Sequence, residues 1–164
     1  MTAAAAATAA PAPAADSAPG PKKAAEAKGG WWWGTGRRKT AVARVRIRPA
    51  KGGEAAVLVQ ITGQKTKTIE QYFAEDRDRS DCYAPLKATN TLGKLDVRIR
   101  VAGGGFMGQA GAVKLGVARA LKGYDPVLEP ILREHKFLTR DSRDVERKKY
   151  GQAGARRRFQ FSKR

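Results

Sequence analysis

The last eighteen residues of the chain, 147–164, read RKKYGQAGARRRFQFSKR and contain eight Lys or Arg but no Asp or Glu. A segment with so few aliphatic residues cannot offset the entropy cost of ordering its backbone, so it cannot fold by itself. It must stay solvated or lie against a partner. We therefore expect residues 141–164 to form an extended basic arm rather than part of a compact domain.

The net charge indicates the class of partner. The chain has 33 Lys and Arg against 15 Asp and Glu, a formal net charge of +18 on 164 residues. Nucleic acid is the first candidate, because Lys and Arg contacts to phosphates release counterions. A membrane surface would need an amphipathic basic helix, and no run approaches the roughly 18 apolar residues of a transmembrane helix. We expect no membrane partner.

Composition divides the chain into three zones. Residues 1–30 are nearly all Ala, Pro, Gly, Ser, Thr and Lys, so we expect a disordered extension. Residues 31–140 have enough apolar side chains for one modest globular domain, and the arm follows. Cys82 is the only cysteine, which excludes a disulfide within the chain and favours a reducing, cytoplasmic location.

Apolar side chains alternate in two clear strands of the globular zone. In residues 41–48, AVARVRIR, the apolar side chains share one face and three arginines lie on the other. Residues 95–101, LDVRIRV, alternate in the same way. Turn residues at 49–53 followed by an apolar run at 55–61 predict an antiparallel hairpin with the first strand.

Helices account for most of the remaining apolar positions. Thr68 can cap a short helix over 69–73, and a second helix is expected to include 86–92. A glycine loop at 103–105 opens a longer helix with Gly123 as its C-cap. The segment 127–138 predicts a last helix that is interrupted or restarted at Pro130. Strands and helices mixed in one small domain indicate an α+β sandwich of sheet and helices.

Catalytic constellations are missing from this sequence. The glycines at 103–108 satisfy G-x-G-x-x-G, but the acid about 20 residues on, Asp125, follows no strand, so a dinucleotide site is disfavoured. The loop either permits a tight turn or lets backbone N–H groups approach an anion. His135 is the only histidine, and it has no evident metal-binding or catalytic partner. We expect no enzyme activity, metal, cofactor or small-molecule substrate.

Aromatic and cationic residues gather before the first strand. In WWWGTGRRK, residues 31–39, cations beside glycines suit close approach to phosphates, and aromatic rings suit stacking on unpaired bases. Two interpretations of Trp31 to Trp33 stay open, because the rings can stack on RNA or close over the edge of the domain itself.

Four stretches together resemble the bacterial form of ribosomal protein S9. They are GTGRRKTAVARV at 34–45, IEQYF at 69–73, LDVRIRVAGGGFMGQAGAVKLGVARAL at 95–121, and TRDSRDVERKKYG with ARRRFQFSKR at 139–164. The resemblance covers the chain from Gly34 to its C-terminus in the same order. Departures are the Ala/Pro-rich extension, the Trp triplet and the cation-free GQAGA at 151–155.

The resemblance implies a structural, ribosome-bound protein of the small-subunit head with a left-handed βαβ crossover. Implied partners are small-subunit rRNA, peptidyl-site tRNA and neighbouring ribosomal proteins. The tRNA contact falls to the tip of the arm, at Ser162, Lys163 and Arg164. The implied rRNA contacts are Arg37, Arg38, Lys39, Arg44, Arg46, Gly103, Gly104, Gly105, Gln109, Arg140, Arg143, Arg147, Lys148, Lys149, Arg156, Arg157 and Arg158. The alternative is a basic protein that compacts DNA or RNA outside the ribosome.

Overall fold

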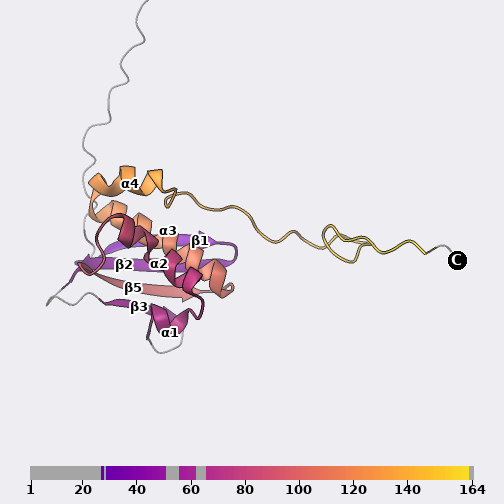
Figure 1. The fold of residues 1–164 in the computed structure, drawn as a ribbon, viewed down its shortest axis with the longest axis horizontal. Helices are drawn as coiled ribbons and strands as arrows, with labels where there is room; N and C mark the ends of the chain where they lie inside the picture. The colour runs from indigo at the N-terminus through magenta and orange to yellow at the C-terminus, as the bar shows by residue number, and fades with distance from the viewer. Residues whose placement is uncertain (1–26, 28, 51–55, 62–65, 163–164) are drawn as a thin grey trace, which may run out of the picture.

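The computed structural model describes residues 27, 29–50, 56–61 and 66–162. The described chain forms one five-stranded sheet with helices packed against it (Figure 1), which confirms the α+β class. Three predictions concern residues outside the described part. They are the disorder of residues 1–26, the turn at 51–53 and the role of the tip residues Lys163 and Arg164.

The strands are β1 Trp32–Arg38, β2 Ala41–Pro49, β3 Val57–Ile61, β4 Lys67–Thr68 and β5 Leu95–Ala102. The helices are α1 Ile69–Tyr72, α2 Asp76–Ala88, α3 Phe106–Tyr124 and α4 Glu129–Glu134, with a 3-10 turn at Pro126–Leu128 before α4.

The strand order is β1-β2-β5-β3-β4. The predicted hairpin of β2 with β3 is wrong, because β5 lies between them, antiparallel to β2 and parallel to β3. Turn residues after β2 indicate where the chain turns, but they do not select the strand that pairs next. The pairing observed places Val45 opposite Ile99 and Ile47 opposite Val97, so apolar residues of both strands share one face.

Strand β1 was not predicted, yet it forms the true hairpin with β2 through Lys39 and Thr40. Its inward positions include Gly34 and Gly36, which are buried but carry no apolar side chain. The period-2 signal that revealed β2 and β5 was therefore absent from β1.

Between β3 and its parallel neighbour β5, the chain passes through β4, α1 and α2. This segment is the βαβ crossover that the family resemblance implied. Its left-handed course remains a prediction.

The core lies between the inner face of the sheet and α3. The alternation predicted for β2 and β5 is confirmed, since the inward residues of both strands are buried. Asp96 departs from it, because this outward residue of β5 is also buried, in an ion pair with Arg48. The buried side of α3 includes Val113, Val117 and Leu121. The sheet and α3 thus enclose one continuous hydrophobic cluster.

Two of the helix ends agree with expectation. The Thr68 hydroxyl accepts a hydrogen bond from the Gln71 backbone N–H at 3.3 Å, and the Gln71 side chain accepts one from the Thr68 N–H at 3.4 Å. This is a capping box, and it confirms Thr68 as the cap of α1. Pro130 lies in the first turn of α4, so the helix restarts there as predicted.

The other helix boundaries differ from those predicted. The helix expected to include 86–92 is α2, which ends at Ala88 because Asn90 has a left-handed φ of 52°. Gly123 is not a C-cap, since α3 continues to Tyr124 and Asp125 ends it. The last helix was expected to reach 138 but ends at Glu134, where Lys136 turns the chain with φ 56°. The turns that follow the helices thus set the helix ends, and the periodicity of apolar residues could not predict them.

Glycines allow α3 to lie directly on β1. A Cβ on Gly36 would lie 1.9 Å from the Ala112 carbonyl oxygen, and one on Gly34 would lie 2.2 Å from that of Gly116. These distances are far inside van der Waals contact, and the neighbouring atoms are backbone. Helix and strand can therefore approach this closely only while both positions stay glycine.

We predict that Gly36→Ala destabilises the fold by about 1–3 kcal/mol or more, because overpacking forces α3 away from β1. Urea unfolding followed by circular dichroism measures the change. Gly105→Ser is the matched control, since a Cβ there meets nothing within 4 Å and Ser caps a helix at least as well as Gly at this N-cap, so it should cost little stability. Equal stability of Gly36→Ala and the wild type would contradict the close packing.

Candidate nucleic-acid interface

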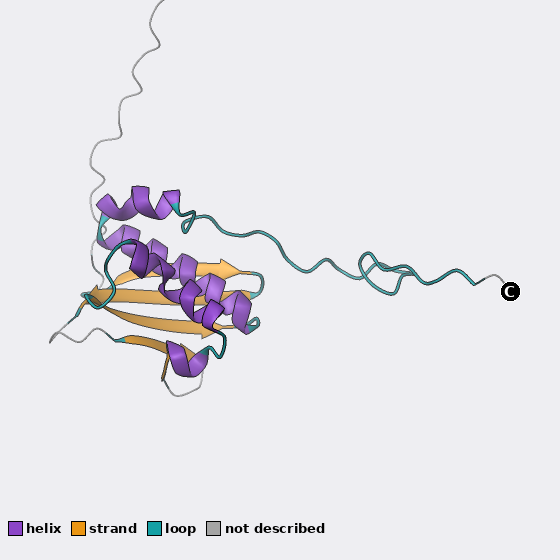
Figure 2. Ribbon diagram, viewed as in Figure 1, coloured by secondary structure: helices purple, strands orange, loops and turns teal. Residues whose placement is uncertain are grey.

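One face of the sheet carries arginines instead of helices. In the described part of the chain, α2 and α3 lie to one side of the strands (Figure 2), and α3 packs on β1 and β2. The opposite face presents the outward side chains of β2 and β5. We call this set the arginine face: Arg44, Arg46, Arg48, Arg98 and Arg100.

The register places arginines directly across from one another. Arg44 lies opposite Arg100, and Arg46 lies opposite Arg98. Like charges at directly paired positions destabilise a sheet, so the face gains from an anionic partner. The side chains of Arg44 and Arg100 form no hydrogen bond or ion pair with any residue that the structure describes.

Asp96 is the one acidic side chain in these paired rows. The Arg48 Nε donates to it at 2.9 Å, and the Ala56 backbone N–H donates to its other oxygen at 3.3 Å. Arg48 is thus neutralised within the protein. The unbalanced positive charge of the arginine face comes from its other four members.

The Trp triplet divides between the two faces of the sheet. Trp32 points inward, where its ring meets Tyr124 edge-on at a centroid distance of 4.9 Å. Trp31 lies on the arginine face, with the Arg48 guanidinium carbon 4.5 Å from its ring centroid and that of Arg46 at 5.1 Å. Trp33 shares this face and is 53% exposed. Trp32 therefore closes over the domain, as one of the two interpretations held. Trp33 keeps an exposed ring, and stacking on RNA stays a prediction.

The glycine loop is a rigid turn at one end of the sheet. Gly103 and Gly104 have φ values of 71° and 68°, a backbone region that disfavours residues with a Cβ. The Gln109 side-chain amide donates to the Gly103 carbonyl at 3.0 Å, and its oxygen accepts from the Tyr72 hydroxyl. Gln109 is buried, so its amide shapes the loop from within, and any part it has in binding RNA is indirect.

Two sequence clusters meet at this end of the sheet. A Cβ on Gly103 would lie 2.9 Å from the Thr40 carbonyl oxygen, so the glycine loop touches the β1–β2 turn. Arg37 and Lys39 beside that turn are exposed. Cationic side chains and the exposed backbone of Gly105 therefore share one surface, although Lys39 and Gly105 are 66 residues apart in sequence.

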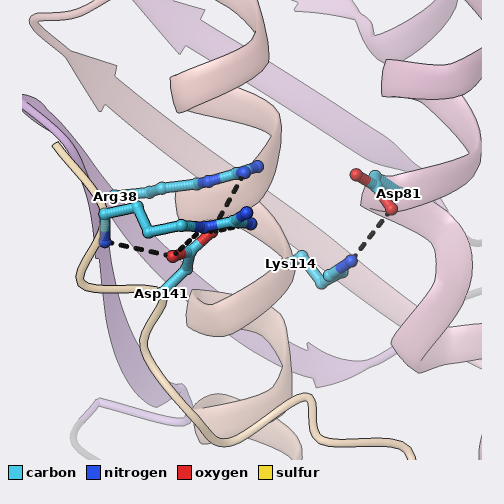
Figure 3. Close-up of polar contacts among 5 residues, drawn as sticks. Arg38, Asp81, Lys114 and Asp141 are labelled. Carbon is cyan, nitrogen blue, oxygen red and sulfur yellow. Dashed lines mark hydrogen bonds and ion pairs between the residues drawn. The ribbon is translucent and has the colours of Figure 1, made fainter. Parts of the chain in front are cut away.

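The arm begins at the same end, where it is fastened to β1 (Figure 3). The Arg38 guanidinium lies 3.2 Å from the Asp141 carboxylate. Arg38 reaches it by crossing α3 at Gly111, where a Cβ would lie 2.3 Å from the Arg38 Cδ. Nearby, Lys114 on α3 pairs with Asp81 on α2 at 2.9 Å (Figure 3). Arg38 was predicted to contact rRNA; its guanidinium pairs here with an acid of the chain itself, and the rRNA contact stays a prediction.

Asp141 also binds Arg143, a second predicted rRNA contact. The Arg143 guanidinium donates to both carboxylate oxygens, at 3.0 and 2.9 Å, and its backbone N–H donates at 3.1 Å. These bonds, with a smaller contribution from Arg38, hold the pKa of the Asp141 carboxyl well below its usual range. Asp141 therefore stays ionised and anchors the arm at any pH near neutral.

Beyond Asp141 the arm runs away from the domain (Figure 1). Glu146 and Arg156 close a loop in it through two hydrogen bonds of 2.8 and 2.7 Å, and these bonds lower the pKa of the Glu146 carboxyl. Tyr150, Phe159 and Phe161 are 96%, 70% and 88% exposed. The predicted rRNA contacts that lie exposed here are Arg140, Arg143, Arg147, Lys148, Lys149, Arg156, Arg157 and Arg158, and Ser162 of the tip is exposed as well.

Three members of the arginine face were not among the predicted contacts: Arg48, which pairs with Asp96, and the two β5 residues Arg98 and Arg100. The signal for the two β5 residues was present in the sequence, since both stand at the polar positions of the alternating segment 95–101. What the sequence lacked was the pairing of β5 beside β2, which turns two separate rows of cations into one surface.

The described residues offer little for catalysis. Cys82 is buried, and burial raises the pKa of its thiol to about 12, which makes it a poor nucleophile. No group of three or more His, Cys, Asp or Glu in these residues could hold a metal ion. No helix in the described ranges has the length and apolarity to cross a membrane.

The Asp141 anchor has a testable titration. We predict that its carboxyl titrates well below the ordinary value of about 3.9 and that Arg143→Gln raises this pKa, because the main hydrogen-bond donor is lost. A lowered folded-state pKa means that the stabilisation is complete above the ordinary value and is lost as pH falls through the lowered one. Carbon-detected NMR of the carboxyl measures it. Arg147→Gln, the control, should leave it unchanged, and an unchanged value in Arg143→Gln would contradict the assignment.

Comparison with known proteins identifies the family. Residues 36–164 match the family described as Ribosomal protein S9/S16. The "Small ribosomal subunit protein uS9" of Thermotoga petrophila is 54% identical over 131 residues, 80% of this chain and 94% of the relative. Those of Rhodopirellula baltica and Anaeromyxobacter dehalogenans are 52% and 48% identical, over 80% and 79% of this chain and 90% and 93% of the relatives. The chain therefore belongs to the ribosomal protein S9 family, which is structural and not enzymatic.

Proposed function

We propose that the chain is a structural protein of the head of the small ribosomal subunit, where it binds rRNA and neighbouring ribosomal proteins in the cytoplasm. The observation that carries the proposal is the exposed positive charge: a sheet face of arginines, a cationic turn beside the glycine loop, and a basic arm, all on one family member. Phosphates of folded RNA match such a surface, since each contact releases counterions.

The domain and the arm are suited to different parts of the rRNA. Its cations stand on a narrow chain that leaves the domain at the Arg38–Asp141 anchor, so it can enter gaps between RNA segments that the domain cannot. The domain would seat the protein on rRNA through Arg37, Lys39 and the arginine face. The arm would then follow the rRNA toward the tRNA held in the peptidyl site.

In this proposal, the tip at Ser162, Lys163 and Arg164 contacts that tRNA. Two adjacent cations suit phosphates, which carry no base identity. Such contacts fit a site that accepts tRNAs of every anticodon.

Sedimentation tests the ribosomal role directly. The full chain, tagged and expressed in bacterial cells, should sediment with small subunits in lysate and stay with them after nuclease removes DNA. Sedimentation with DNA, or with RNA of every kind in proportion to its mass, would contradict the proposal and favour a compacting protein.

The turn beside the glycine loop should contribute to salt-dependent binding. We predict that Arg37→Gln with Lys39→Gln reduces the slope of log affinity for rRNA against log salt by about 0.7 to 0.9 per lost contact. Arg38 is left in place because it anchors the arm. Filter binding across a salt series measures the slope. Lys87→Gln with Lys94→Gln removes equal charge outside the proposed contacts and should change it less, and equal slopes in the two variants would sink the assignment.

The tip prediction concerns tRNA alone. Deletion of residues 162–164 should leave folding and subunit assembly intact, because the anchor and the remaining arm cations stay in place. It should speed tRNA dissociation from the peptidyl site of purified small subunits by about ten-fold or less, since two charge-assisted contacts are lost.

The matched control removes the same charge from the middle of the arm. Lys148→Gln with Lys149→Gln should weaken rRNA binding but leave tRNA dissociation at the wild-type rate. Equal dissociation from wild-type and truncated subunits would refute the tRNA role of the tip. Faster dissociation of one tRNA alone would show that the tip reads bases.

A further inference from the structure

The arginine face is hollowed at its centre. A cavity of about 360 Å³ lies over β1, β2, β5 and β3. Four arginines of the face, Arg44, Arg46, Arg98 and Arg100, line it together with Trp33 from β1 and Gln60 from β3. Clefts that hold small ligands range from roughly 300 to 1,000 Å³, so this cavity has room for one small group and not for a helix.

The lining combines two kinds of chemistry in neighbouring rows. One row across the sheet holds Trp33, Arg46 and Arg98, and the next holds Arg44 and Arg100. Side chains two residues apart on a strand stand about 6.5 Å apart along it. A flat ring thus lies one step away from two guanidinium groups that have no partner among the described residues.

Trp33 is available on its outer side. The Arg46 guanidinium carbon lies 5.7 Å from its ring centroid, which supports the ring by a cation–π contact, yet 53% of the residue is exposed. An exposed indole in a cationic hollow suits a flat, electron-rich group with an anion beside it. A nucleotide has both parts, whereas an acidic peptide would pair with the arginines and leave the Trp33 ring without a stacking partner.

We propose that this hollow binds one unpaired nucleotide, with its base stacked on Trp33 and its phosphate held by Arg44 and Arg100. The amide of Gln60, at the end of the phosphate row, is placed to meet polar groups of the same nucleotide. This rests on the proposed rRNA binding and goes further, because it names a single-stranded feature, a base out of its helix, that the rRNA must present to the sheet. Recognition by stacking tolerates any base.

A pair of oligonucleotides isolates the stacking. The full chain is titrated with a fluorescently labelled uridine pentamer and with an abasic pentamer of the same sugar-phosphate backbone, and anisotropy gives both affinities. The arm binds the phosphates of both probes equally. The ratio of the two affinities therefore reports contacts to bases.

We expect Trp33→Ala to reduce the affinity ratio by roughly ten-fold, the effect of losing one base–aromatic stack, and Trp33→Phe to retain most of it. Arg100→Gln should weaken both pentamers equally and lower the salt slope by about 0.7, whereas Lys87→Gln should change neither. Tyr150→Ala removes an aromatic ring that is 96% exposed on the arm and should leave the ratio as in the wild type.

Three results would overturn the proposal. A ratio unchanged by Trp33→Ala would show that no base stacks there. A ratio lost in Tyr150→Ala alone would place the base on the arm. Displacement of the uridine pentamer by a hexaglutamate peptide as readily as by unlabelled pentamer, in wild type and Trp33→Ala alike, would assign the face to an acidic protein. Wild-type binding to an rRNA fragment, measured in parallel, separates these results from a failure of rRNA binding itself.

Discussion

The packing of α3 directly against β1 and β2 determines the arrangement of the whole molecule. Gly34 and Gly36 leave no side chain between strand and helix, so α3 fits closely and covers the inner face of the sheet. Because α2 packs on α3 from the same side, every long helix of the described chain lies on that face. The outer face is left to arginines, and a surface for anions follows from the way the core closes.

Much of this fold could be predicted from alternation and capping. The strands around Val45 and Ile99 and the cap at Thr68 were local signals, written in residues close together in sequence. The pairing of β5 between β2 and β3 was not local, and neither was β1, whose inward glycines fit only because α3 comes to meet them. Pairing depends on contacts between distant segments, which no single window of sequence displays.

The predicted interface shows the same difference between local signals and contacts made by distant segments. Runs of cations on the arm were visible at once, and the structure leaves most of them exposed. Arg38 and Gln109 have side chains that suit RNA, but in the fold both donate hydrogen bonds within the protein, to Asp141 and to the glycine loop. Arg98 and Arg100 gained importance only through strand pairing. A residue type therefore indicated the partner well, and its position in the fold decided which residues were free to meet it.

The facing arginines of β2 and β5 also affect the protein before any partner arrives. Arg44 lies opposite Arg100 and Arg46 lies opposite Arg98. These like charges repel across the middle of the sheet, which lowers the stability of the free domain. A ligand that binds only the folded state adds its binding free energy to folding, and an anion on this face removes the repulsion as well. A polyanion that binds this face would therefore stabilise the fold, and the free chain would unfold more easily than the bound one.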